Sequence, residues 1–152
     1  MEDSLLNKLS VLCDKVEKLK TDRYVVCKNG LWSIIDSNNN ILTDVYIDMK
    51  VDTVGQRVIA RNVKGIAVMY DYDANIVSTV EFSDLVPVGN GNYVATLNTS
   101  AQELVGLIDK DMNIILSFIY QQIYICPDHL ILFLGAGGGR RKVNLNGEKI
   151  DK

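Results

Sequence analysis

The hydrophobic positions of the chain follow two different periods. Within residues 3–20 an apolar side chain recurs every three or four positions, at Leu5, Leu9, Leu12, Val16 and Leu19. This spacing is typical of an amphipathic α-helix, so residues 1–22 are predicted to form an N-terminal helix. We expect its apolar stripe to pack on the protein's own sheet, and self-association through the stripe is the alternative.

After residue 22 the helical period disappears. Short runs of β-branched and aromatic residues alternate with turn-forming residues, which lie at Asn29-Gly30, 38–40, 89–91, 98–100 and 135–139. Hairpin connections of this kind join neighbouring antiparallel strands. Residues 23–152 are therefore predicted to form a mainly β domain.

An internal repeat appears when the aspartates that end the apolar runs are aligned. Asp36, Asp71 and Asp109 are each followed four residues later by Asn and five residues later by Ile. A truncated fourth copy carries Asn144 in place of the aspartate, so these markers are 35, 38 and 35 residues apart. This regularity predicts an antiparallel array of about three and a half units of three strands each.

Two stretches of this repeat, GLWSIID at 30–36 and ELVGLID at 103–109, resemble the WG-repeat (KWG) family, whose pattern is roughly G-x-W-G-L-I-D-x-x-G with a trailing Tyr. The Trp of the pair is present only at Trp32, its Gly only at Gly106, and the turn glycine only at Gly147. The resemblance covers residues 23–150. It implies a non-enzymatic protein-binding module or scaffold.

The residues at the repeated positions are interpreted as parts of turns and of the core. The segments from each Asp to its Asn are predicted to be tight turns, in which a carboxylate binds nearby backbone amides. A calcium loop would need an acid at its twelfth position, where these copies have Phe82 and Tyr120, so no metal or cofactor is predicted. Large residues at a fixed phase are expected to be core anchors, namely Trp32, Tyr46, Phe82 and Tyr120.

No catalytic group is predicted. The single histidine, His129, lies three residues after Cys126. If both belong to one strand, their side chains point to opposite faces and cannot form a Cys-His dyad. The chain is therefore expected not to be an enzyme.

A glycine-rich segment, 135–139, precedes Arg140 and Arg141. Glycines let backbone amides approach an anion, and two arginines can pair with it, so these arginines are candidate binding residues for a nucleotide or another small anion. Phosphate-binding motifs require a helix directly after the glycines, whereas an extended run follows here. A hairpin loop is therefore the preferred interpretation.

Charge suggests the type of partner. The net charge is −3, but residues 29–139 hold five Lys and Arg against twelve Asp and Glu. An acidic body argues against direct nucleic-acid binding and favours a protein with a basic surface. One specific form of this hypothesis is a small prokaryotic or mobile-element inhibitor that occupies the groove of a basic nucleic-acid-handling enzyme.

Two features bear on location. No apolar run approaches the ~20 residues that span a bilayer, and the N-terminus lacks the basic and apolar regions of a signal peptide. The three cysteines, Cys13, Cys27 and Cys126, have neither a disulfide nor a zinc pattern. A cytoplasmic protein without membrane association is expected.

Overall fold

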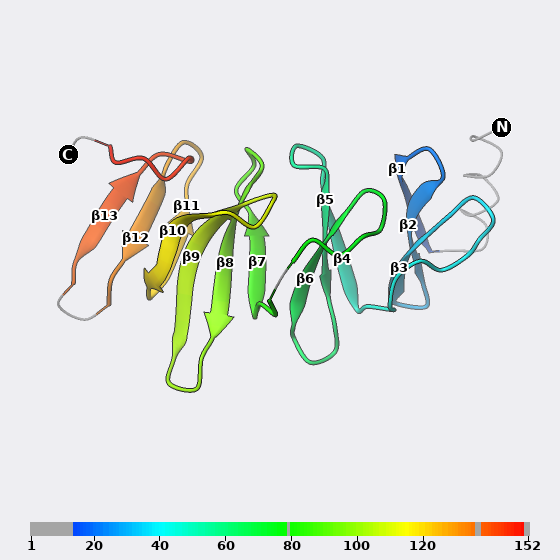
Figure 1. Cartoon of the computed structure of the whole chain (residues 1–152), viewed down its shortest axis with the longest axis horizontal. Helices are drawn as coiled ribbons and strands as arrows, with labels where there is room; N and C mark the ends of the chain where they lie inside the picture. The colour runs from blue at the N-terminus through cyan, green and yellow to red at the C-terminus, as the bar shows by residue number, and fades with distance from the viewer. Residues whose placement is uncertain (1–13, 79, 136–137, 151–152) are drawn as a thin grey trace. The chain divides into compact units, whose positions relative to one another are not determined.

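The computed structural model describes residues 14–78, 80–135 and 138–150. These residues form thirteen β-strands in four antiparallel sheets (Figure 1). The chain divides into two compact units, one containing residues up to Val51 with Gln56–Val77, the other Asp52–Gly55 with the residues from Ser78 onward. The predicted β-rich class is confirmed.

The predicted N-terminal helix is wrong over the residues that the structure describes. Lys15–Lys20 form strand β1, and no residue in the described ranges is helical. Val16 packs against one core cluster and Leu19 against another. Residues three apart on a strand face opposite sides, so a spacing that suits a helix here serves a strand with apolar contacts on both faces. Leu5, Leu9 and Leu12 lie outside the described residues.

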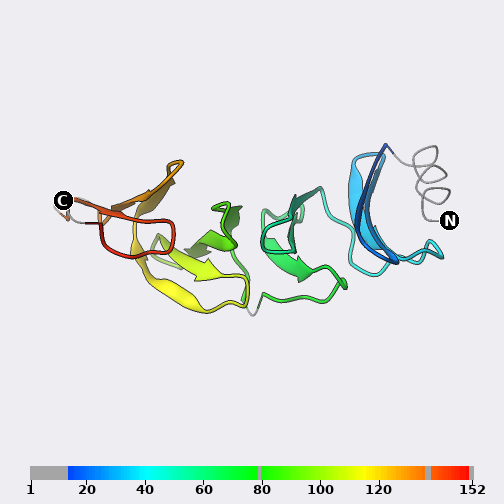
Figure 2. The same cartoon turned by 90° about the horizontal axis from the view of Figure 1, so that it is seen from above.

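The first unit contains two three-stranded sheets (Figures 1 and 2). Their strands are β1, β2 (Arg23–Lys28) and β3 (Leu31–Ile35), followed by β4 (Asp48–Asp52), β5 (Arg57–Arg61) and β6 (Ala67–Asp71). One core joins the two sheets, with Val25 and Ile34 from the first and Met49, Val58 and Ala60 from the second. Neither sheet buries its apolar face alone, which is the behaviour expected of a repeat array.

The second unit also contains two sheets, one of four strands and one of three. Their strands are β7 (Asp84–Pro87), β8 (Asn92–Asn98), β9 (Glu103–Asp109) and β10 (Ile114–Tyr120), then β11 (Gln122–Ile125), β12 (Leu130–Phe133) and β13 (Arg140–Val143). Leu107 of the first sheet and Leu130 and Leu132 of the second are almost fully buried in one shared cluster.

The repeat markers form turns with the same hydrogen bonds. The Asp36 Oδ1 atom accepts the backbone N–H groups of Asn38 and Asn40 at 2.9 Å. Equivalent pairs of bonds, also at 2.9 Å, are made by Asp71, Asp109 and Asn144. The fourth residue of each turn has a left-handed backbone: φ is 67° at Asn39, 69° at Ala74, 70° at Met112 and 83° at Gly147.

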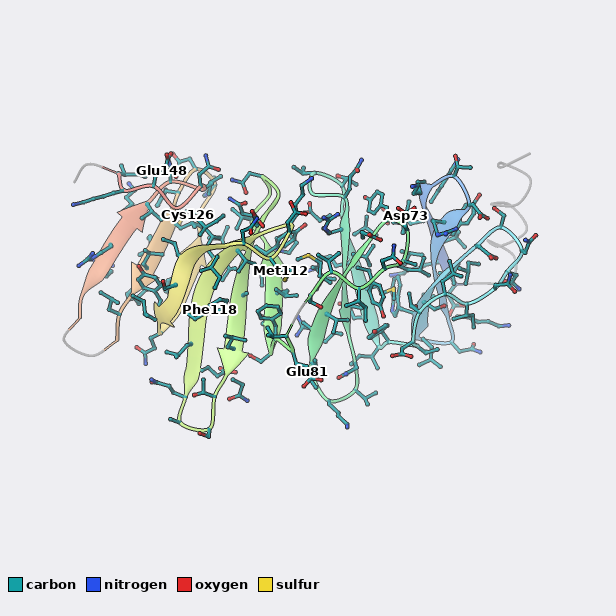
Figure 3. All side chains as sticks on the ribbon, in the orientation of Figure 1. Asp73, Glu81, Met112, Phe118, Cys126 and Glu148 are labelled. Carbon is teal, nitrogen blue, oxygen red and sulfur yellow. The ribbon has the colours of Figure 1, made fainter. Side chains whose placement is uncertain are left out.

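In the fourth copy the donor and acceptor side chains of the turn are exchanged, but the hydrogen bond between them is kept. In the third copy the Asn113 amide donates to the Asp109 carboxylate at 2.9 Å. In the fourth, the Asn144 amide donates to the carboxylate of Glu148, labelled in Figure 3, also at 2.9 Å. The backbone therefore needs an acceptor oxygen at the marker, which either an aspartate or an asparagine supplies.

This exchange leads to a stability prediction for the third turn. Asp109→Asn is expected to cost less than about 1 kcal/mol, because an amide oxygen can still accept both backbone bonds, whereas Asp109→Ala removes the acceptor and should cost about 1–2 kcal/mol. Urea denaturation of both variants at neutral pH measures the difference. Equal losses in the two variants would contradict the acceptor interpretation.

The difference in stability between wild type and Asp109→Asn should depend on pH. Burial raises the pKa of Asp109, but hydrogen bonds from Asn113 and the Asp111 backbone outweigh it and lower the pKa below 3.8. A lowered folded-state pKa stabilises the protein above the unfolded value, and that stabilisation is lost as pH falls through the folded value. The advantage of wild type over Asp109→Asn should therefore shrink in acid below pH 3.8.

Candidate functional site

Three of the repeated aromatic residues lie in cores. Tyr46, Phe82 and Tyr120 are buried. The Tyr46 hydroxyl lies 2.6 Å from that of Tyr70, and the two rings meet edge to face with centroids 5.9 Å apart. Phe82 stacks with Phe118, labelled in Figure 3, at a centroid distance of 6.3 Å. These rings pack within the protein as core anchors, although Tyr120 also lines the groove described below.

Trp32 differs from them because it is half-buried. Its backbone N–H and C=O both pair with Tyr46 at 2.8 Å. The ammonium nitrogen of Lys15 lies 5.7 Å from the centroid of its ring. Trp32 thus joins β3 to the connector that follows it, and its ring is partly covered by a cation from β1.

The candidate arginines lie beside a groove in the second unit. Arg140 and Arg141 begin β13 directly after the glycine-rich segment, of which residues 136 and 137 lie outside the described ranges. The groove has a volume of about 980 Å³. Its lining is basic on one part and apolar on the other: His129, Arg140, Arg141, Lys142 and Lys149, then Leu116, Tyr120, Ile131, Leu132, Val143, Gly147 and Ile150.

Pairing within the last sheet determines the direction of each side chain. Residues directly opposite one another in an antiparallel sheet share a face, and neighbours along a strand alternate. Arg141 pairs with Leu132, and Arg140 pairs with Phe133. The two arginines therefore lie on opposite faces of β13, so they cannot hold one small anion as a bidentate pair from a single loop.

One face of this sheet is core, and we name the other the open face. Buried residues of β11–β13 occupy the core face. The register places six side chains on the open face, in two rows across the strands: Gln122, Phe133 and Arg140, then Tyr124, Ile131 and Lys142.

The cations of the groove have few acidic neighbours. Among the described residues Arg140, Arg141 and Lys149 form no ion pair. His129 Nδ1 lies 2.6 Å from a carboxylate oxygen of Asp128. That hydrogen bond is the largest cause of the lowered pKa of Asp128, and Lys142 adds a smaller favourable charge interaction. The groove therefore has a positive electrostatic character in a chain whose net charge is −3.

Cys126 and His129 are not on one strand. They close the hairpin between β11 and β12, where the Cys126 N–H donates to the His129 carbonyl at 2.9 Å. The argument from opposite faces of one strand therefore does not apply to this pair. Among the described side chains no hydrogen bond joins the Cys126 thiol to the imidazole, whose Nδ1 is paired with Asp128. The contacts of the described residues therefore place the imidazole against Asp128.

Two kinds of feature are absent from the described part of the chain. No group of three or more His, Cys, Asp and Glu side chains there could hold a metal ion. Nor do the described residues include a helix with the length and apolarity needed to cross a membrane.

Sequence reasoning missed Tyr124, Phe133 and Lys142 as members of an exposed surface. The sequence carries little signal for them, because LILF is apolar throughout and RRKV begins with three cations. Burial alternates along β12, but the faces of β11 and β13 can be assigned only when the register of the three strands is known.

A second exposed feature is apolar and follows the repeat. The isoleucine five residues after each aspartate marker is exposed in every copy: Ile41 is 61%, Ile76 57% and Ile114 63% accessible. Each pairs with the residue that precedes its marker: Ile35, Tyr70 and Ile108 respectively. In the fourth copy the corresponding residue is Lys149, which pairs with Val143.

No protein-family model matches the chain, and no curated protein matches it. The WG-repeat resemblance stays a prediction.

Proposed function

We propose that this chain is a protein-binding module without catalytic activity, and that the exposed side of its repeats contacts the partner. The observation that carries the proposal is the exposed isoleucine at one repeat position in three copies. Single exposed apolar residues are common on protein surfaces. Recurrence at Ile41, Ile76 and Ile114, each held by the same backbone pairing, is more specific than scattered exposure.

The first copy carries further exposed apolar residues near Ile41. Leu42, Val45 and Ile47 are also exposed, so the connector between β3 and β4 carries four accessible aliphatic residues within 41–47. Contiguous exposed apolar segments of this type mark interaction sites in soluble domains. Burial of each such side chain by a partner would contribute about 25 cal/mol for each Å² removed from water.

The charges beside this connector indicate the chemistry of the partner. Asp44 and Asp48 are exposed among the aliphatic residues. An apolar contact surrounded by carboxylates complements a protein surface whose apolar centre is rimmed by Lys or Arg. We infer a protein partner with a basic, partly apolar surface.

The test is a comparison of three versions of the chain, each tagged and incubated with extract of its native cell. Ile41→Ser/Val45→Ser is expected to lose at least one protein that wild type retains. Val63→Ser is the control, because Val63 is 81% exposed but lies outside the repeated position. Mass spectrometry identifies the retained proteins, and circular dichroism establishes that all three versions are folded.

Identical sets of retained proteins for wild type and Ile41→Ser/Val45→Ser would rule out this surface. Salt adds a second readout, since a partner held partly by Asp44 and Asp48 should be released as ionic strength rises from about 50 mM to about 500 mM.

A further inference from the structure

The open face of β11–β13 combines accessible aromatic surface with unpaired cations. Tyr124 is 52% exposed, on the edge strand β11 of a sheet whose other face is core. Its ring meets that of Phe133 edge to face, with centroids 5.1 Å apart and an interplanar angle of 82°. Phe133 therefore supports the tyrosine from one edge and leaves much of its ring accessible.

The cations of this face flank the aromatic pair. The guanidinium carbon of Arg140 lies 6.0 Å from the centroid of Phe133. This contact lays the side chain along the sheet, and its charge is not neutralised by any carboxylate of the described residues. Lys142 lies on the same face two residues further along, roughly 7 Å away at the extended spacing of a strand.

We propose that this open face binds a short segment of single-stranded nucleic acid. A base stacks on the exposed ring of Tyr124, and successive phosphates lie beside Arg140 and Lys142. Aromatic rings with neighbouring cations on an exposed surface are the combination that binds single strands without sequence preference, because every base has a flat π-face.

The acidic body of the chain does not oppose this ligand in the way that it opposes a double helix. A duplex presents many phosphates and its bases are stacked internally, so it needs a wide basic surface and gains nothing from Tyr124. A short single strand needs only a small basic area and offers unstacked bases. Asp128, in the turn between β11 and β12, interacts with the charge of Lys142, but its carboxylate is already hydrogen-bonded to His129.

Fluorescence anisotropy of the full chain with a labelled thymidine strand of about ten nucleotides tests the proposal. We expect saturable binding near 50 mM salt, with log K falling against log salt at a slope of about −0.7 for each phosphate contacted. Tyr124→Leu keeps apolar volume but removes the stacking ring, and should weaken binding about fivefold or more. Arg140→Gln/Lys142→Gln should reduce the salt slope by about 1.4.

The matched control is Lys50→Gln/Lys64→Gln, which removes two exposed cations of the first unit and the same total charge. It should bind like wild type. Far-UV circular dichroism and the urea midpoint establish that each variant is folded, which is expected because every substituted side chain is exposed.

Several results would overturn the proposal. One is the absence of any anisotropy change at low salt. A second is unchanged affinity in Tyr124→Leu. A third is equal displacement of the strand by inorganic polyphosphate at the same phosphate concentration, which would identify an anion-binding surface that does not recognise bases. Tighter binding of a duplex than of a single strand of equal length would contradict the proposal as well.

Discussion

Replacing Phe82 by alanine is expected to lower the free energy of unfolding of the second unit by roughly 3–5 kcal/mol. The side chain is 3% exposed and stacks on Phe118, so truncation leaves a cavity and removes the ring contact. Tyr120→Ala should have an effect of similar size, because Tyr120 lies in the cluster that joins the two sheets of this unit. Chemical denaturation of the single variants measures both losses.

Tyr124→Ala is the control for these two variants. It removes a tyrosine from the same unit at an exposed position, and should cost less than about 1 kcal/mol. Losses below about 1 kcal/mol for Phe82→Ala and Tyr120→Ala as well would show that the repeated aromatic is not a core anchor.

The second large effect is expected at the turn of the fourth copy, where Gly147→Ala should cost about 2–4 kcal/mol. Two penalties combine. The backbone is left-handed, which costs a residue with a Cβ about 1–2 kcal/mol. The new Cβ would also lie 2.7 Å from Ile115 Cγ2 and 3.3 Å from Leu107 Cδ2, within a packed core.

Gly65→Ala separates the two penalties. Gly65 has a similar φ of 81°, but a Cβ added there would meet nothing within 4 Å. Its cost should therefore be limited to the backbone term of about 1–2 kcal/mol. Thermal or urea unfolding of both variants gives the comparison, and equal losses at the two glycines would show that crowding at Gly147 has no energetic effect.

The turns show how far local sequence reasoning reaches. An aspartate that binds the amides two and four residues later needs only a short segment of chain, so the pattern of Asp36, Asp71 and Asp109 was visible without a structure. Asn62, between β5 and β6, makes the same backbone bonds with Gly65 at the left-handed position. The repeat alignment did not include it because it lies outside the repeat phase.

The N-terminal segment shows the limit of the same reasoning. Val16 and Leu19 have a spacing that fits a helix, and nothing nearby in the sequence argues against one. Pairing with β2 makes this segment a strand, because β1 forms its hydrogen bonds with β2, with Lys15 opposite Cys27 and Val16 opposite Val26. A preference of a few tenths of a kcal/mol for each residue is readily overridden by such pairing.

The candidate site, too, was predictable from the sequence only in part. Arg140 and Arg141 were recognisable as residues that could bind an anion, since their chemistry belongs to the residues themselves. Their assignment to opposite faces, and the association of Arg140 with Phe133, Tyr124 and Lys142, required the register of β11–β13. A shift of one residue in that register would move each side chain to the other face.

The sequence by itself determined where this chain turns, how often its unit recurs and that it is rich in β-structure, because these properties depend on residues within a few positions of one another. Only the tertiary structure decided that residues 15–20 form a strand, which sheet faces share a core and which side chains form the open face. Those outcomes depend on pairing between segments far apart in the chain, and no local pattern specifies the partner or the register of a strand.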